Sequence, residues 1–208
     1  MSQLMPVEAL RRKQLDDLIN PGDADMQAFR APLYDTQLYT SASTTSLTFF
    51  GAINTDKSMS NVKGQGGVFP NNFYFEPIWM NIDILANASL GANTALGIQD
   101  DIQRLVLSGR GFFQITIGQL TYPQTPISYA HASGGAVGSL AGTWTAPQQV
   151  QVGNNGVQDS GYSVYRSFII GPQMPFSVVL TWPSAQTLAS GNTNIRVSFD
   201  GNWHTPVQ

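Results

Sequence analysis

The amino-acid sequence predicts an all-β fold, because apolar and polar residues alternate in several short segments that Gly, Pro and Asn separate. In the segment FSVVLTW, the residues that share one face are Phe176, Val178, Leu180 and Trp182. In NIRVSFD, the apolar residues Ile195, Val197 and Phe199 alternate with polar ones. A period of two residues is typical of antiparallel strands with one buried face.

About eight strands follow from such patterns. They are expected at residues 46–50, 73–84, 113–117, 126–130, 148–152, 162–170, 176–182 and 194–200. Within 73–84 the apolar phase shifts at Pro77, which predicts a bulge or an edge strand there. The set predicts a single eight-stranded jelly roll, a β-sandwich or barrel formed by residues 41–208.

One inserted helix is expected in GIQDDIQRLVLSGRG. Its apolar residues Ile98, Ile102, Leu105 and Val106 follow helical spacing. Asp100 and Asp101 favour the first turn of this helix, and Gly109 can end it.

Residues 1–40 are expected to form an N-terminal arm, because ten charged residues lie there. Pro6 suits the first turn of a helix, and Asn20-Pro21-Gly22 stops that helix. The residues near one face, which we expect to dock on a partner surface, are Val7, Leu10, Leu18 and Ile19. The cluster Arg11, Arg12 and Lys13 suits lipid head groups or nucleic-acid phosphates. The alternative is a solvated helix face, since the neighbouring acids nearly cancel its charge.

Composition narrows the function. Of the 208 residues, 42% are hydrophobic and 11% are charged, where about 25% charged is usual. The net charge of −3 argues against a main role in wrapping nucleic acid, so no specific nucleic-acid recognition is expected. Because the chain has no Cys, disulfides, thiolate metal sites and Cys nucleophiles are excluded.

Catalytic chemistry finds little support in the sequence. The histidines are His131 and His204, and Asp200 precedes His204 by four residues in an expected turn after a strand. That spacing fixes no hydrogen bond, and no Gly-x-Ser-x-Gly nucleophile elbow occurs. No catalytic residue, metal site or cofactor is therefore predicted. Trp144 and Trp203 lie in or beside expected loops, where they could stack on sugars or plug the ends of a sandwich core.

The second half of the chain is nearly free of charge. No Asp, Glu, Lys or Arg occurs between Arg110 and Asp159, and only four occur from Gly111 to the end. Burying charge at an interface is costly unless every ion is paired, whereas amides, hydroxyls and glycine escape that cost. We therefore expect this half to form contacts with copies of the same chain.

The order of several segments carries a family resemblance. These segments are an N-terminal helix, SLTFFGAIN, a Gly-rich loop, FPNNFYFEPIWMNIDI, a helix, GFFQITIGQLTYP, FSVVLTWP and IRVSFDGNW. The series resembles the jelly-roll major capsid proteins of tailless icosahedral bacteriophages, including lipid-containing, corticovirus-like kinds. The resemblance implies upright barrels in trimers or pseudo-hexamers, with the N-terminal helix facing a membrane or the genome. It implies no catalytic residue, and the length of the chain suits one barrel better than two.

The leading hypothesis is thus a structural virion protein, a capsid subunit assembled in the host cytoplasm with copies of itself and other capsid or vertex proteins. The alternative is a receptor-binding or carbohydrate-binding β-sandwich module that uses Trp144 and Trp203. The third hypothesis is an enzyme, a hydrolase acting through His204 and Asp200.

Overall fold

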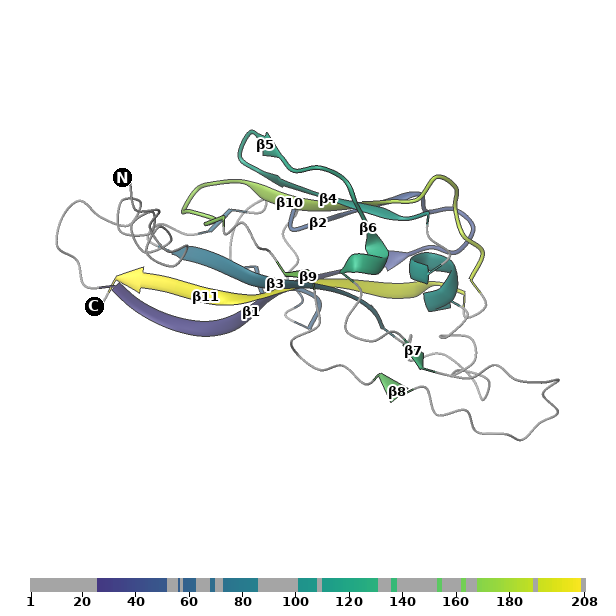
Figure 1. Ribbon diagram of the computed structural model, residues 1–208, viewed down its shortest axis with the longest axis horizontal. Helices are drawn as coiled ribbons and strands as arrows, with labels where there is room; N and C mark the ends of the chain where they lie inside the picture. Colours follow the sequence, from purple (N-terminus) through teal and green to yellow (C-terminus); the bar gives the residue numbers. More distant parts are fainter. Residues whose placement is uncertain are drawn as a thin grey trace, which may run out of the picture.

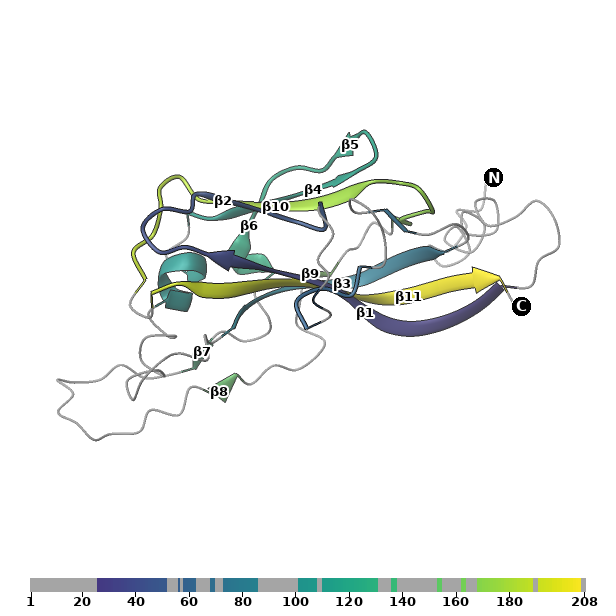
Figure 2. The same cartoon turned by 180° about the vertical axis from the view of Figure 1, so that it is seen from behind.

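Two antiparallel sheets pack face to face and form the layers of a β-sandwich (Figure 1). The structure is a computed structural model. It describes residues 26–51, 56, 58–62, 68–69, 73–85, 101–107, 110–130, 136–137, 153–154, 162–163, 168–188 and 191–206. The view from behind shows the same two layers (Figure 2). The prediction of an all-β sandwich is confirmed.

Each sheet draws its strands from distant parts of the chain. Sheet A has the order β1-β11-β3-β9. Its strands are β1 (Met26–Tyr39), β11 (Thr193–Pro206), β3 (Tyr74–Leu85) and β9 (Tyr162–Ser163). Sheet B has the order β2-β10-β4-β5, with β6 also paired to β4. Its strands are β2 (Ser46–Phe49), β10 (Phe176–Thr181), β4 (Phe112–Ile117), β5 (Leu120–Thr121) and β6 (Thr125–Pro126). Two short strands, β7 (Ala136–Val137) and β8 (Gly153–Asn154), pair with each other apart from both sheets.

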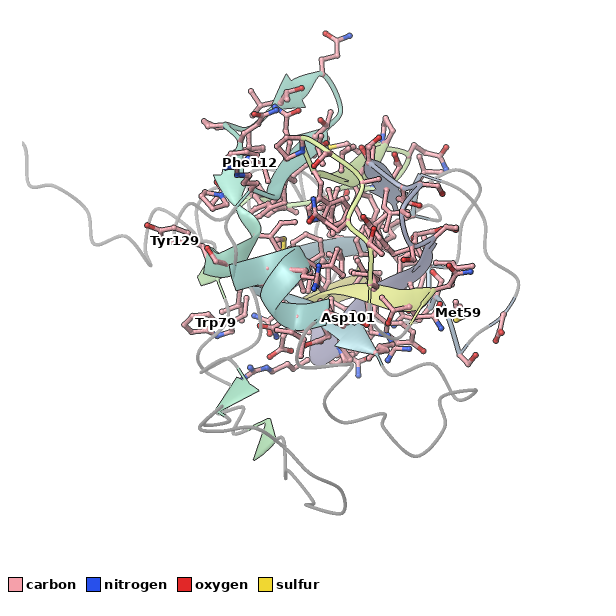
Figure 3. All side chains as sticks on the ribbon, turned by 90° about the vertical axis from the view of Figure 1, so that its right-hand side faces the viewer. Met59, Trp79, Asp101, Phe112 and Tyr129 are labelled. Carbon is pink, nitrogen blue, oxygen red and sulfur yellow. The ribbon has the colours of Figure 1, made fainter. Side chains whose placement is uncertain are left out.

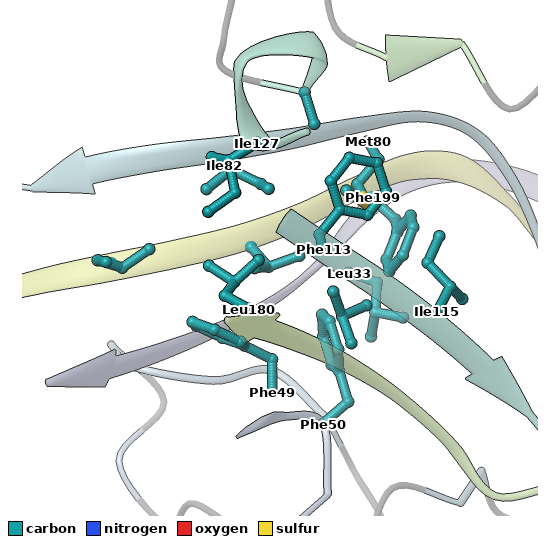
Figure 4. Packing of buried hydrophobic residues seen from close by; sticks show 14 of the residues in the cluster. Leu33, Phe49, Phe50, Met80, Ile82, Phe113, Ile115, Ile127, Leu180 and Phe199 are labelled. Atoms are coloured by element: carbon teal, nitrogen blue, oxygen red, sulfur yellow. The ribbon is translucent and has the colours of Figure 1, made fainter. Parts of the chain in front are cut away.

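The core lies between the sheets and is filled by the inward residues that the alternation predicts (Figure 4). On β10 and β11 the buried residues are Phe176, Val178, Leu180, Ile195, Val197 and Phe199. In the middle, the ring of Phe50 lies 5.1 Å from that of Phe176 and 5.7 Å from that of Phe199. Burying one large apolar side chain contributes about 1.5–3 kcal/mol. Packing between the sheets is therefore the main stabilising contribution.

The bulge predicted at Pro77 is present. The pairing of β3 with β11 shifts register between Asp200 and Gly201, so that Asp200 faces Trp79 and Gly201 faces Pro77. Ile78 is therefore the extra residue. Proline has no N–H to donate to the ladder, and a bulge lets a strand accommodate it. The strand is not an edge strand, because β9 pairs with its other side.

The boundary of the N-terminal arm needs correction. Residues 26–39, which the sequence assigned to the arm, form β1 and pair with β11 along its 14 residues. Phe29, Ala31 and Leu33 share one face of β1, but the next residue on that face is Asp35, which is 1% exposed. Because a charged residue occupies this buried position, apolar and polar residues do not alternate in the usual way, and the sequence does not predict the strand. The helix predicted within residues 1–25 lies outside the described residues.

Three other expected strands have different outcomes. Within 126–130 only Pro126 is in a strand, and a 3-10 turn, η2 (Ile127–Tyr129), follows, because the Ala130 N–H bonds to the Ile127 carbonyl at 2.9 Å. The strand expected at 194–200 continues to Pro206 without a turn after Asp200, because β1 pairs with β11 over this whole length. The strand expected at 148–152 lies outside the described residues.

The inserted helix is confirmed over residues 101–107, of which Gln103–Leu107 (η1) is a π-helix. Ile102, Leu105 and Val106 are buried as their spacing predicts. The Trp182 ring N–H donates to the Leu105 carbonyl at 3.0 Å and ties the helix to the end of sheet B. Figure 3 shows this end of the sandwich, with Asp101 on the helix. Among the described residues, no helix is long and apolar enough to span a membrane.

Candidate docking surfaces

Charged residues are segregated by sheet. The strands of sheet B contain no Asp, Glu, Lys or Arg. The strands of sheet A contain Arg30, Asp35, Glu76, Asp83, Arg196 and Asp200. The sequence places Arg196 and Asp200 in the charge-poor half, yet the fold gathers both into the charged sheet. Among the strands of the two sheets, the absence of charge is thus a property of sheet B alone. Most of residues 131–167, which carry few charges as well, lie outside the described residues.

The outer face of sheet B, here called the sheet B face, is built from hydroxyl, amide and apolar side chains. Because inward residues alternate with outward ones on each strand, its members follow from the register. They are Ser46, Thr48, Phe112, Gln114, Thr116, Thr121, Ser177, Val179 and Thr181. Thr48, Val179 and Gln114 align across three neighbouring strands. Covering this face with another molecule would bury no ion from the sheet's own strands.

Two large apolar side chains are exposed on strands of sheet B. Phe112 is 36% exposed on β4, and Leu120 is 59% exposed on the short strand β5. Single exposed apolar residues are ordinary on protein surfaces. Phe112 belongs to the sheet B face and adds apolar area to it, whereas Leu120 pairs with the inward-facing Ile117 and lies outside that face.

The charges of sheet A are held by other groups of the protein. The Arg30 guanidinium pairs with the Asp200 carboxylate, with Nε at 3.0 Å from Oδ2. Arg196 donates from Nε to the Thr36 hydroxyl at 3.0 Å and from its terminal nitrogen to the Ser58 carbonyl at 2.8 Å. Sheet A therefore presents ordered charges, and covering its outer face would require a partner with matching groups.

His204 lies in a different environment from the one that its sequence spacing suggested. Its Nε2 is 3.6 Å from Glu76 Oε2, while Asp200 is bound by Arg30. The His204 side chain is 9% exposed, and its Nε2 has no hydrogen-bond partner. A distance of 3.6 Å is beyond hydrogen-bond range. The carboxylate beside His204 is thus Glu76, not Asp200, and it makes no hydrogen bond that would hold the ring for base catalysis.

At the other end of the sandwich, sheet A extends beyond sheet B (Figures 1 and 2). An aromatic pocket lies there, lined in part by residues of β1 and β11. It has a volume of about 210 Å³. Its lining residues, here called the aromatic pocket, are Phe29, Ala31, Pro32, Asn61, Phe69, Phe73 and Trp203. The Phe29 and Trp203 rings are stacked 6.4 Å apart across paired positions of β1 and β11.

The polar groups of the aromatic pocket are already bonded within the protein. The Trp203 ring N–H donates to the Ala31 carbonyl at 3.1 Å. The Asn61 amide accepts from the Tyr34 N–H at 2.8 Å and donates to the Pro32 carbonyl at 2.7 Å. A sugar needs partners for its hydroxyl groups, whereas an apolar side chain needs none. The aromatic pocket therefore fits an apolar occupant better than a sugar.

Of the site residues that the sequence singled out, the structure describes Trp203, His204 and Asp200. The residues outside the described part are Val7, Leu10, Arg11, Arg12, Lys13, Leu18, Ile19, His131 and Trp144. The sequence missed Phe29, Phe69 and Phe73 as companions of Trp203. Phe29 could have been found by its alternation with Ala31 and Leu33, but nothing local in the sequence brings Phe69 to this pocket.

Among the residues that the structure describes, no group of three or more His, Asp or Glu side chains is placed to hold a metal ion. Comparison with protein families, with curated proteins and with solved structures finds no match to this chain. The two surfaces above are therefore the features from which a function can be argued.

Proposed function

We propose that this protein is a capsid subunit, a structural virion protein that assembles with copies of itself through the sheet B face. The observation that carries the proposal is the complete absence of charged residues from the strands of sheet B, next to a sheet A that has six. A free monomer gains colloidal protection from surface charge, so a whole sheet without it is a disadvantage unless the sheet is covered.

The strand pairing supports a jelly roll as the framework. Eight strands of the two sheets, taken in chain order, pair first with last, second with seventh, third with sixth and fourth with fifth. The pairs are β1 with β11, β2 with β10, β3 with β9, and β4 with β5. This is the pairing of one long hairpin rolled into two sheets, the arrangement of jelly rolls that is common in viral shells. The resemblance to capsid proteins of tailless phages agrees with this topology.

Desolvation energies favour the sheet B face over the outer face of sheet A as the principal contact. Burying an unpaired ion at an interface costs several kcal/mol, while a hydroxyl or amide that finds a partner costs little. Interface cores are depleted of charge for the same reason. Self-contact through sheet B therefore needs shape complementarity and hydrogen-bond partners for its hydroxyls and amides, but no matching of ions.

A matched pair of substitutions tests this proposal. Ser177 on β10 and Ser198 on β11 are both half-buried, outward-facing residues on an inner strand of their sheet. We expect Ser177→Asp to raise the protein concentration required for assembly at least about tenfold, because the new carboxylate would be buried in the contact; tenfold corresponds to about 1.4 kcal/mol. Ser198→Asp should change that concentration by less than about twofold. Sedimentation velocity and negative-stain microscopy measure assembly.

The control for this experiment is the stability of each variant, followed by thermal unfolding, so that loss of folding is not mistaken for loss of assembly. Equal effects of the two substitutions would contradict the proposal, as would a wild-type protein that stays monomeric at high concentration across pH and salt. Selective binding on a glycan array that Trp203→Ala abolishes would instead support the carbohydrate-binding alternative.

A further inference from the structure

The aromatic pocket leaves large apolar side chains uncovered. Phe29 is 44% exposed, and Phe73 and Trp203 are half-buried. The rings of Phe69, Phe73 and Phe75 lie 5.0, 6.4 and 4.8 Å from that of Trp203, so the walls hold one another in place. Covering exposed apolar surface of this kind with another apolar group is favourable by roughly 25 cal/mol per Å² buried.

The chain itself supplies a segment at this position. β1 begins at Met26, three residues before Phe29 in the wall of the pocket, and 25 residues precede it. Three residues of strand cover roughly 10 Å. The linker of residues 20–25 spans up to about 20 Å when extended, and Asn20-Pro21-Gly22 within it favours a reversal of direction. The preceding residues can therefore fold back over the pocket without disturbing β1.

The chemistry of that segment complements the aromatic pocket. A helix over residues 7–19 would be about 20 Å long and would carry Val7, Leu10 and Leu18 on one face, within about 80° of one another around its axis. Such a helix is marginal alone and needs an apolar surface to stabilise it. The pocket has the apolar surface and no unbonded amide or indole group that would demand a polar partner.

We propose that the aromatic pocket binds the N-terminal segment of the same chain, with the Leu10 face of residues 7–19 against Phe29, Phe73 and Trp203. A linker of this length gives the segment an effective concentration on the order of millimolar at the pocket. A segment from another molecule at micromolar concentration cannot compete with that. The docking concerns the free subunit and does not depend on assembly.

Engineered cysteines test the contact in the full-length chain, because the natural sequence has none. Leu10→Cys combined with Phe73→Cys should form a disulfide within one chain under mild oxidation, at least about tenfold faster than Arg12→Cys combined with Phe73→Cys. Residues 10 and 12 lie about 200° apart around a helix, so only the first points to the pocket. Non-reducing electrophoresis and peptide mapping separate disulfides within a chain from those between chains.

Each other outcome of the cross-linking overturns the proposal. Equal rates for the two pairs would show that no face of the segment is preferred, and disulfides only between chains would show that a neighbouring copy occupies the pocket. No disulfide from either pair in a folded protein would show that the segment lies elsewhere.

A second measurement keeps the natural pocket. Leu10→Asp should raise the emission of anilinonaphthalene sulfonate several-fold by uncovering the aromatic pocket, while Arg12→Asp should leave it unchanged. Unchanged emission from Leu10→Asp would contradict the proposal. So would a rise in emission when the wild-type protein is stripped of lipid with detergent, which would identify an acyl chain as the occupant.

Discussion

Gly201→Ala is expected to destabilise the protein by about 3 kcal/mol or more, near the upper end of the cost of overpacking. A Cβ at residue 201 would collide with the Glu76 carbonyl oxygen and would lie 2.8 Å from the Phe75 ring and 2.9 Å from the Pro77 Cα. Two of these neighbours are backbone atoms of the bulged strand, so they cannot rotate away. Urea unfolding at constant m-value measures the loss.

Gly171→Ala is the matched control for that substitution. Gly171 is also buried, but a Cβ there would lie 3.8 Å from the Tyr74 ring, an ordinary contact distance. We expect a change below about 1 kcal/mol, which is typical of substitutions that strain nothing. If the two alanine variants unfold at the same urea concentration, the close approach of β11 to the bulge is not what Gly201 provides.

Asp35→Ala is expected to cost about 2–4 kcal/mol, because buried donors would lose a charged acceptor. Asp35 Oδ2 accepts the Phe50 N–H at 2.7 Å and the Gln37 side-chain amide at 3.2 Å, and Oδ1 accepts the Thr36 N–H at 3.0 Å. Phe50 has a positive φ of 63° at the end of β2. The Asp35 carboxylate thus fixes the backbone at Phe50, where the chain leaves sheet B and the Phe50 ring packs into the core.

An exposed aspartate with similar bonds provides the comparison. Hydrogen bonds from the Ser58 hydroxyl and N–H hold the pKa of Asp56 below its ordinary value. Because water can replace those bonds, we expect Asp56→Ala to leave the urea midpoint nearly unchanged. A midpoint for Asp35→Ala as high as that of the wild type would show that the Phe50 N–H finds another acceptor.

The sequence predicted the parts of the fold that rest on simple alternation. β10 and the first half of β11 have one buried face without interruption, and the phase shift at Pro77 correctly located the bulge. β1 was missed because its alternation continues through a buried carboxylate, Asp35, whose partner Phe50 is 15 residues away. Local patterns cannot identify an acid that is buried to bond a distant N–H group.

The candidate surfaces could be predicted only in part. A charge-poor composition was visible in the sequence, but the assembly of uncharged strands into sheet B depends on pairings such as Val179 with Thr48 and Gln114, which join three distant segments. Trp203 was singled out, yet its pocket required Phe29 and Phe69 from other parts of the chain. Long-range strand register, which no local pattern reports, decides both surfaces.

The most direct test of the central claim is an electron cryo-microscopy structure of the assembled particle, examined at Thr48, Gln114, Thr116, Ser177 and Val179. We expect these residues of the sheet B face to lie against neighbouring subunits and to lose most of their remaining exposure. A particle in which the sheet B face is open to water while the charged outer face of sheet A forms the contacts between subunits would contradict it.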